Sequence, residues 1–145
     1  MICLIQRVTQ AKVEVNHKMI GKIGPGLVVL TAFQPNDDSQ NINKMVHKLL
    51  HYRLFADEED KMNLNIQQVK GSLLLVPQFT LAADTQKGLR PSFSSSAKPN
   101  IATQLFDEFV DKMRDAPTLI ETGKFGADMQ VTLTNDGPVT FWLET

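Results

Sequence analysis

The sequence predicts an α+β fold, in which mainly antiparallel strands form a barrel-like sheet core with two main helices in a single domain, residues 1–145. Three observations support this fold class. The chain has 145 residues, a length typical of one domain that buries roughly 70% of its unfolded surface. Apolar and polar residues alternate near both ends of the chain, which indicates strands. Two internal segments instead repeat apolar residues at helical spacing.

The N-terminal third is predicted to contain only strands. A turn is expected at Asn16-His17-Lys18 because asparagine tolerates a positive φ, and Gly24-Pro25-Gly26 marks a second turn. The apolar run after these glycines is typical of a strand buried on both faces. The four expected strands cover residues 2–8, 11–15, 19–23 and 27–33.

Two helices are predicted from their apolar stripes. Asp38 or Ser39 is expected to cap the first helix, and Asn100 the second, which ends before Pro117. The stripes consist of Ile42, Met45, Val46, Leu49 and Leu50, and of Ile101, Leu105, Phe109, Val110 and Met113. Between the helices, the sequence predicts short strands over residues 52–55, 64–69 and 73–76, and a long surface loop over residues 82–100.

Two further strands are predicted at the C-terminal end, over residues 129–134 and 139–143. The segment Asn135-Asp136-Gly137-Pro138 lies between them and is expected to form a hairpin turn, because Asn-Asp-Gly is an ordinary turn signal. Pro138 is less ordinary at this place, since it removes an amide donor from the start of the next strand.

Composition and charge exclude several classes of protein. Lys plus Arg is 15 and Asp plus Glu is 16, a balance that argues against a broadly basic nucleic-acid binder but allows a local basic edge at Lys87, Arg90 and Lys98. Cys3 is the only cysteine, so no intrachain disulfide is expected. The N-terminal residues do not resemble a signal peptide, and the apolar runs are far shorter than a membrane span. We therefore expect a cytoplasmic protein without membrane contact.

Several candidate sites are better explained without chemistry. His47 and His51 have a spacing that brings two imidazoles to one metal, but no third ligand is evident. The acidic run at residues 57–60 lacks the ligand spacing of a calcium loop, and nothing near Cys3 favours its thiolate. The histidine pair and the acidic run are expected on the solvated surface, and the cysteine is expected to pack in the interior. The sequence thus predicts no metal site and no cofactor.

Two segments carry more information. In Pro77-Gln78-Phe79-Thr80-Leu81 an apolar strand continues into polar side chains beside the long loop, a place suited to a binding site. The second is Asn135-Asp136-Gly137-Pro138-Val139-Thr140, with its unusual proline. Taken singly, the residues favour a structural role for the first segment and a plain turn for the second.

Together, the two segments resemble the pair of signature motifs of the D-aminoacyl-tRNA deacylases. Pro77 stands where this family usually has serine, so any role of that hydroxyl is absent here, and Asp60 stands where glycine is common. The similarity extends over essentially the whole chain and includes Gln6-Arg7-Val8, Gly24-Pro25-Gly26-Leu27, Lys61-Met62-Asn63-Leu64, Gly88, Arg90-Pro91-Ser92-Phe93, Thr122-Gly123, Phe125-Gly126-Ala127 and Met129.

The resemblance implies a homodimer that hydrolyses the ester bond between a D-amino acid and the tRNA 3′ end. It implies that the Gly137–Pro138 peptide is cis and enters the partner's active site, where its two carbonyls hold the substrate's α-ammonium group. An L side chain would then meet backbone, so the enzyme selects by rejection. Such a filter accepts glycine, so the expected partners are tRNA acceptor ends that carry a D-amino acid or glycine.

The resemblance also assigns roles to residues. Gln78, Phe79 and Thr80 are the expected catalytic residues. The expected substrate-binding residues are Arg7, which holds the Gly-Pro segment, Phe125, which receives the terminal adenosine, and Ala127, Met129, Gly137 and Pro138.

Two routes of ester cleavage follow from these residues. Thr80 as a nucleophile would need a base, and no His, Lys or Asp has an evident claim to that role. In the favoured route, the 2′-OH of the tRNA orients or activates water, while backbone amides stabilise the oxyanion. Two other functions stay open: a Thr-dependent hydrolase of small esters, and a noncatalytic module that binds tRNA ends.

Overall fold

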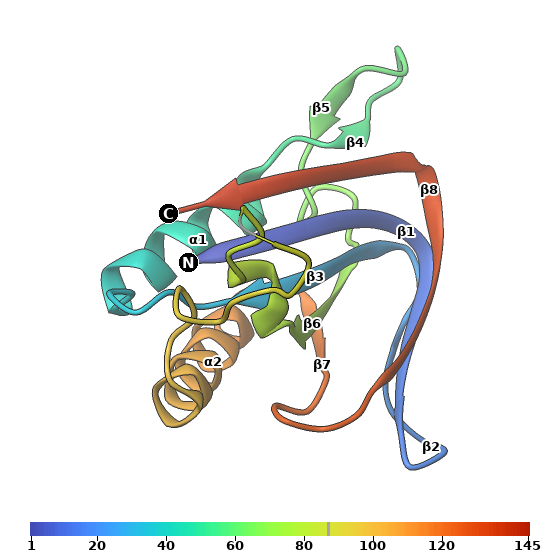
Figure 1. Ribbon diagram of the computed structural model, residues 1–145. Helices are drawn as coiled ribbons and strands as arrows, with labels where there is room; N and C mark the ends of the chain where they lie inside the picture. The colour runs from blue at the N-terminus through green and yellow to red at the C-terminus, as the bar shows by residue number, and fades with distance from the viewer. Residues whose placement is uncertain (87) are drawn as a thin grey trace.

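The computed structural model describes residues 1–86 and 88–145; Lys87, part of the expected basic edge, lies outside them. Two long helices lie against one side of a nearly closed, barrel-like sheet (Figure 1), which confirms the predicted fold class. In chain order the elements are β1 (Ile2–Val15), β2 (Lys18–Ile23), β3 (Gly26–Ala32), α1 (Ser39–His51), β4 (Phe55–Ala56), β5 (Met62–Leu64), β6 (Ser72–Pro77), the 3-10 helix η1 (Phe79–Ala82), α2 (Pro99–Arg114), β7 (Leu119–Thr122) and β8 (Gln130–Glu144).

The main sheet is mixed, which corrects the expectation of mainly antiparallel strands. Its order is β2-β1-β3-β6-β7, where β3 pairs with residues 2–8 of the long strand β1 and β2 pairs with residues 11–15. In addition, β8 pairs with β1. The strand β1 is antiparallel to β2, β3 and β8, whereas β6 is parallel to both β3 and β7. The parallel pairs arise because the chain crosses from β3 to β6 through α1, and from β6 to β7 through α2. Helical crossovers of this kind return the chain in the same direction.

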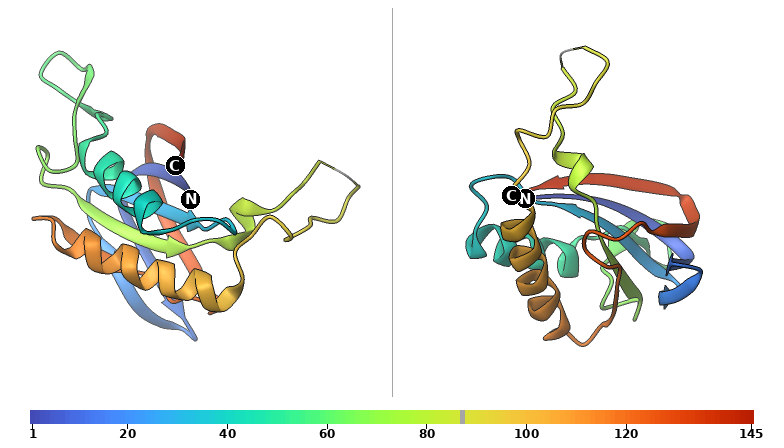
Figure 2. Two further views of the ribbon diagram at one scale, coloured as in Figure 1. Left: turned by 90° about the vertical axis from the view of Figure 1, so that its left-hand side faces the viewer. Right: turned by 60° about the horizontal axis from the view of Figure 1, so that its bottom comes forward.

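The barrel closes where β2 approaches β7. Gly21 of β2 makes this approach possible, because a Cβ atom there would lie 3.1 Å from the carbonyl oxygen of Thr122. Both long helices cover the same side of the sheet (Figure 2). Alternate strand residues fill two apolar clusters: Cys3 and Ile5 face the helices, while Val13 and Val28 face the barrel interior. This explains the continuous apolar run in β3.

Helix caps agree with the sequence for α1 but not for α2. The Asp38 side chain accepts hydrogen bonds from the amides of Gln40 and Asn41, so it is the N-cap, as expected. Helix α2 begins at Pro99 with Lys98 as its N-cap instead of Asn100. Proline is favoured at this position because its φ is already helical and its missing N–H would have no partner. No helix in residues 1–86 and 88–145 is long and apolar enough to span a membrane.

Four strand predictions are wrong. The strand expected over residues 52–55 is replaced by β4, which covers only Phe55–Ala56. Residues 66–70 form turns and not a strand, because the Asn65 side chain accepts hydrogen bonds from the amides of Gln67 and Gln68. The strands expected at 2–8 and 11–15 are one strand, β1. Likewise, the hairpin expected at 135–138 is part of one long strand, β8, which pairs with β1 along its length. Register shifts on β1, between Gln6 and Val8 and between Val8 and Gln10, accommodate this irregular segment.

Candidate active site

The parallel strands β3, β6 and β7 bring their carboxyl ends to one edge of the sheet. At that edge β6 passes into η1, and β7 passes into the loop of residues 123–129. Pro77 is tolerated in β6 because the pairing with β7 reaches only Leu75, so its missing N–H loses no bond to that neighbour. Ligands commonly bind at such an edge because loops from neighbouring parallel strands meet there.

A pocket of about 430 Å³ lies at this edge. Three parts of the chain form its walls: the end of β6, the beginning of α2, and the segment that leads into β8. Its lining residues are Val76, Pro77, Gln78, Phe79, Ala97, Pro99, Ala102, Phe125, Gly126, Ala127, Asp128, Met129 and Val131. The pocket thus brings together Gln78 and Phe79 with Phe125, Ala127 and Met129, which the family resemblance assigns to the site from two distant segments.

The wall formed by Ala97, Pro99 and Ala102 was not anticipated. These residues carry no reactive group, and they matter only because the beginning of α2 packs against the end of β6. No local sequence signal reports that packing. Asp128 was also passed over, although it is a charged residue within an otherwise matching motif and is the one charged residue among the lining residues described above.

Gln78 and Thr80 are coupled by a short hydrogen bond. The Gln78 amide N–H donates to the carbonyl oxygen of Thr31 over 2.7 Å, which fixes the residue at the end of β6. Its side-chain Nε2 donates to Thr80 Oγ1 over 2.5 Å. Within residues 1–86 and 88–145, no His, Lys, Asp or Glu side chain hydrogen-bonds to Thr80, and Thr80 is exposed beside the pocket. The hydroxyl therefore has an amide donor next to it and no general base.

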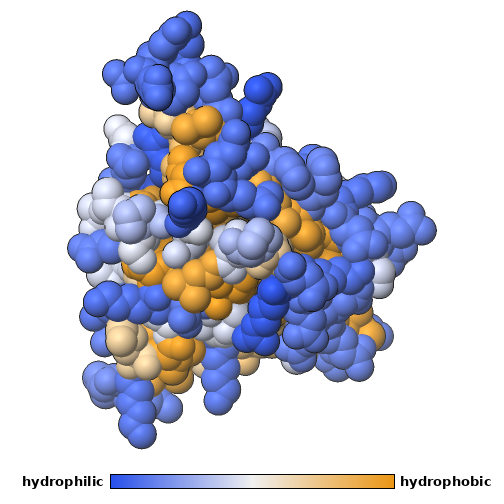
Figure 3. All heavy atoms as spheres, turned by 180° about the vertical axis from the view of Figure 1, so that it is seen from behind, coloured by the Kyte–Doolittle hydropathy of each residue, from blue (hydrophilic) through white to orange (hydrophobic). Residues whose placement is uncertain are grey.

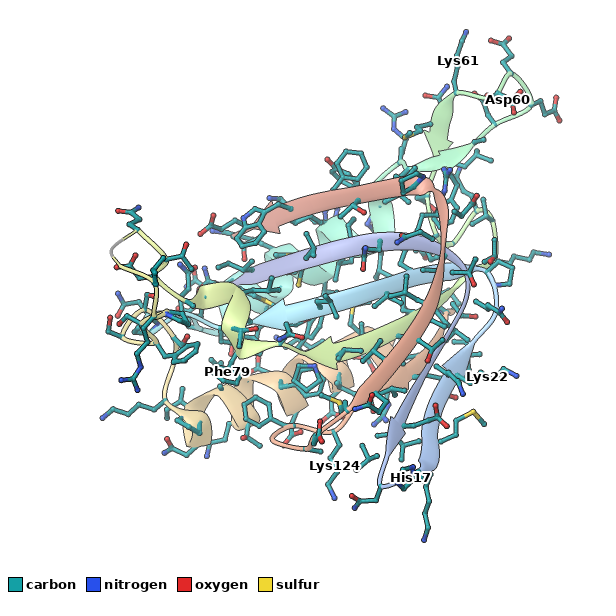
Figure 4. The ribbon with its side chains drawn as sticks, turned by 45° about the vertical axis from the view of Figure 1, so that its right-hand side comes forward. His17, Lys22, Asp60, Lys61, Phe79 and Lys124 are labelled. Carbon is teal, nitrogen blue, oxygen red and sulfur yellow. The ribbon has the colours of Figure 1, made fainter. Side chains whose placement is uncertain are left out.

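Phe79, the first residue of η1, is 52% exposed (Figure 4). Its ring lies 5.1 Å from that of Phe93, and Ser96 Oγ donates to the Phe79 carbonyl oxygen. Among the described residues, no hydrogen bond uses the backbone N–H of Phe79 or of Thr80. Two free amide donors therefore lie beside the pocket.

The opposite wall depends on Gly123. Its amide donates to the Leu75 carbonyl oxygen over 2.8 Å, which holds the loop after β7 close to β6. A Cβ atom at this position would lie 2.8 Å from Met129 Sδ and 3.3 Å from Pro77 Cδ. The absence of a side chain therefore lets Met129 line the pocket. Phe125 contributes a second large apolar surface and packs toward Phe106, with ring centroids 6.4 Å apart.

Arg7, Gly137 and Pro138 lie apart from this pocket in the single chain. Strands β1 and β3 separate the C-terminal half of β8 from β6 in the sheet, whereas the beginning of β8 contributes Val131 to the pocket. Arg7 Nε lies 3.1 Å from Asp136 Oδ2 and donates to the Asp136 carbonyl oxygen, and Nη1 donates to the Leu54 carbonyl oxygen. The Gly137–Pro138 peptide is cis, and both residues are exposed. Arg7 thus anchors an exposed segment that does not line its own chain's pocket.

The other sequence candidates have structural explanations. His47 and His51 stack on the exposed face of α1, and the described residues contain no group of three or more potential metal ligands. Burial raises the pKa of the Cys3 thiol to about 12, which leaves little thiolate at neutral pH. Hydrogen bonds from Asn63 and from the Lys61 amide lower the pKa of Asp57, whose carboxylate orders a projecting, hydrophilic hairpin tip (Figure 3).

The family model of the D-Tyr-tRNA(Tyr) deacylases matches residues 4–144. The chain belongs to this family. Its relatives include proteins named D-aminoacyl-tRNA deacylase from Hydrogenovibrio crunogenus, 62% identical over 100% of both chains, and from Haemophilus influenzae strain PittEE, 59% identical over 99% of both.

Two solved structures are similar to this chain. The c-Myc DNA Unwinding Element Binding Protein is 38% identical, with a TM-score of 0.95, over 100% of this chain and 99% of that one. A probable eukaryotic D-amino acid tRNA deacylase is 20% identical, with a TM-score of 0.85, over 99% and 98% of the two chains, and shares the fold.

Proposed function

We propose that this protein hydrolyses the ester bond of D-aminoacyl-tRNA, with the pocket at Pro77 as its active site. The observation that carries the proposal is the pocket itself, which joins Gln78 and Phe79 to Phe125, Ala127 and Met129 in a member of the deacylase family. Its volume lies within the range of about 300–1,000 Å³ that is usual for small-molecule sites. The reaction releases a free D-amino acid and tRNA, and we place it in the cytoplasm, where tRNA is aminoacylated.

A comparison of D-tyrosyl-tRNA with L-tyrosyl-tRNA tests this proposal. We expect the protein to release D-tyrosine rapidly and to leave L-tyrosyl-tRNA at its spontaneous rate of hydrolysis, because only the D-aminoacyl ester reaches the reactive position. Release of the amino acid is followed over time with and without protein. Equal acceleration of both esters, or of neither, contradicts the proposed function.

In the proposed complex, the terminal adenosine occupies the apolar part of the pocket and the ester lies at its β6 end. Phe125 and Met129 offer the adenine a flat apolar surface, and stacking of a base on an aromatic ring contributes about 1–3 kcal/mol. The free amides of Phe79 and Thr80 are placed to stabilise the oxyanion of the tetrahedral intermediate, a contribution of roughly 3–4 kcal/mol per donor. Gln78 keeps this segment in place through Thr31.

The 2′-OH of the substrate, and not Thr80, is proposed to assist the attack of water. Thr80 accepts a hydrogen bond from an amide and has no base beside it among the described residues, so its hydroxyl is not activated. An aminoacyl ester is already reactive, so positioning and an oxyanion site supply much of the acceleration.

Thr80→Ala is therefore expected to retain measurable deacylation. The variant loses the hydrogen bond from Gln78, a net contribution of about 0.5–1.5 kcal/mol, but keeps its backbone amide, so we expect kcat to fall by no more than about 10-fold. Thr80→Ser is the matched variant that restores the hydroxyl. A covalent acyl group trapped on Thr80, or a loss approaching 10⁴-fold in a folded Thr80→Ala protein, would show instead that the hydroxyl is the nucleophile.

Gly137 and Pro138 are proposed to discriminate between D- and L-aminoacyl groups in the active site of a partner subunit. Their exposure, their anchoring by Arg7 and their separation from their own chain's pocket support this arrangement.

A homodimer is also supported by an apolar row across β8, β1 and β3. In register, Trp142 lies opposite Leu4, which lies opposite Leu30, and the Trp142 side chain is 50% exposed. A second subunit that covers this row would remove it from water.

A further inference from the structure

The outer face of β2, β1 and β8 contains a second hollow, which the proposed chemistry does not use. It has a volume of about 270 Å³, and we call it the lysine hollow. Its polar lining residues come from three adjacent strands and are Gln10, Lys12, Lys22, Thr132 and Thr134. In register, Lys12 lies opposite Lys22 on one side and opposite Thr132 on the other, and Gln10 lies opposite Thr134.

The charges of the lysine hollow favour an anion. Like charges directly opposite each other on neighbouring strands destabilise a sheet, so the pairing of Lys12 with Lys22 is unfavourable without a counterion. Lys12 has one carboxylate beside it, since Glu14 Oε2 lies 2.8 Å from Lys12 Nζ. In the described part of the chain, no ion pair includes Lys22. The hollow therefore has an excess of positive charge together with hydroxyl and amide groups that donate hydrogen bonds, a combination suited to phosphate oxygens.

The lysine hollow lies close to the active-site pocket along the chain. Val131 lines the pocket and its neighbour Thr132 lines the hollow, and successive strand residues point to opposite faces. Adjacent residues at the beginning of β8 thus line the two cavities. Lys124 lies on the loop that leads to β8 (Figure 4), on the same lower half of the molecule as Lys22 and His17. The acidic hairpin with Asp60 projects at the far upper end.

We infer that the lysine hollow binds the sugar–phosphate backbone of the tRNA acceptor arm while the 3′-terminal adenosine occupies the active-site pocket. The inference rests on the proposed function, which supplies an RNA substrate whose end enters that pocket. The RNA leaves the pocket past Lys124, crosses the beginning of β8 and places phosphates against Lys12 and Lys22. The acidic hairpin at the other end of the molecule repels a polyanion and so favours this direction.

The test combines charge removal with two substrates. The double variant Lys12→Gln/Lys22→Gln is compared with Lys44→Gln/Lys70→Gln, which removes two exposed lysines elsewhere on the surface. We expect KM for D-aminoacyl-tRNA to rise about 10-fold in the first variant at low salt, and the slope of log KM against log salt to fall by about 1 to 2, because each neutralised duplex phosphate contributes about 0.9. In the control variant, KM and its salt dependence remain as in the wild type. In both variants, kcat remains as in the wild type. Hydrolysis of a D-aminoacyl adenosine ester, which carries no phosphate, also stays unchanged.

A variant that removes a negative charge distinguishes an effect of charge on KM from an effect of lost stability. Glu14→Gln removes the carboxylate beside Lys12 and is expected to lower KM for the tRNA substrate, an improvement that a structural defect would not produce. An equal rise of KM in the control variant, an unchanged salt slope, or a parallel loss on the adenosine ester would overturn the inference. Binding of uncharged tRNA to each variant is measured as well, because this binding requires no catalysis. A failure of the inference is thereby distinguished from a failure of the proposed function.

Discussion

Gly137→Ala is expected to lower kcat/KM for D-aminoacyl-tRNA by about 100-fold, the loss associated with a displacement of about 1 Å at a reacting centre. Gly137 has a φ of 126°, a region that L residues rarely adopt. A Cβ atom there would lie 2.7 Å from Val139 Cγ2 and 3.3 Å from Arg7 Nη2. The segment must therefore shift against the arginine that anchors it, and the proposed contact with the α-ammonium group of the substrate is lost.

Gly88→Ala is the matched control, since Gly88 also has a positive φ, 71°, but has open space around the position of a Cβ atom. It should cause local strain without loss of hydrolysis. Steady-state rates are measured for both variants beside their unfolding transitions and sedimentation. A folded Gly137→Ala protein with the oligomeric state and the kcat/KM of the wild type would show that this segment takes no part in the reaction.

Periodicity predicted the local elements well and the strand directions poorly. The stripe from Ile42 to Leu50 and the cap at Asp38 define α1 because both signals are local. A strand buried on both faces, such as β3, has the same apolar pattern in either direction, so the parallel pairing with β6 was missed. Similarly, Asn135-Asp136-Gly137 carries a turn signal, and the long-range pairing of β8 with β1 overrides it.

The candidate active-site pocket depends on those strand directions. Gln78 and Phe125 follow different strands and are far apart in the sequence, and they meet because β6 and β7 are parallel and end at the same edge. Polar residues at the end of an apolar strand marked Gln78 as a candidate, but nothing local marked Phe125. The family resemblance joined the two segments, and the structure supplies the physical reason for their proximity.

Glycyl-tRNA is expected to be hydrolysed at a rate close to that of D-alanyl-tRNA, while L-alanyl-tRNA is spared by about 100-fold or more. A methyl group in an apolar pocket is worth about 10- to 200-fold at most, and an obstacle made of backbone cannot move aside as a flexible side chain can. If the Gly137–Pro138 segment excludes the L side chain, it has nothing to act on when that side chain is a hydrogen atom.

The central claim, selection by rejection, is tested most directly by one time course with D-alanyl-, glycyl- and L-alanyl-tRNA at equal concentrations. The account predicts that the D-alanyl and glycyl esters disappear together and that L-alanyl-tRNA persists at its spontaneous rate. A site that recognised D side chains by favourable contacts would instead leave glycyl-tRNA as stable as L-alanyl-tRNA, and that result would contradict selection by rejection even in a D-specific enzyme.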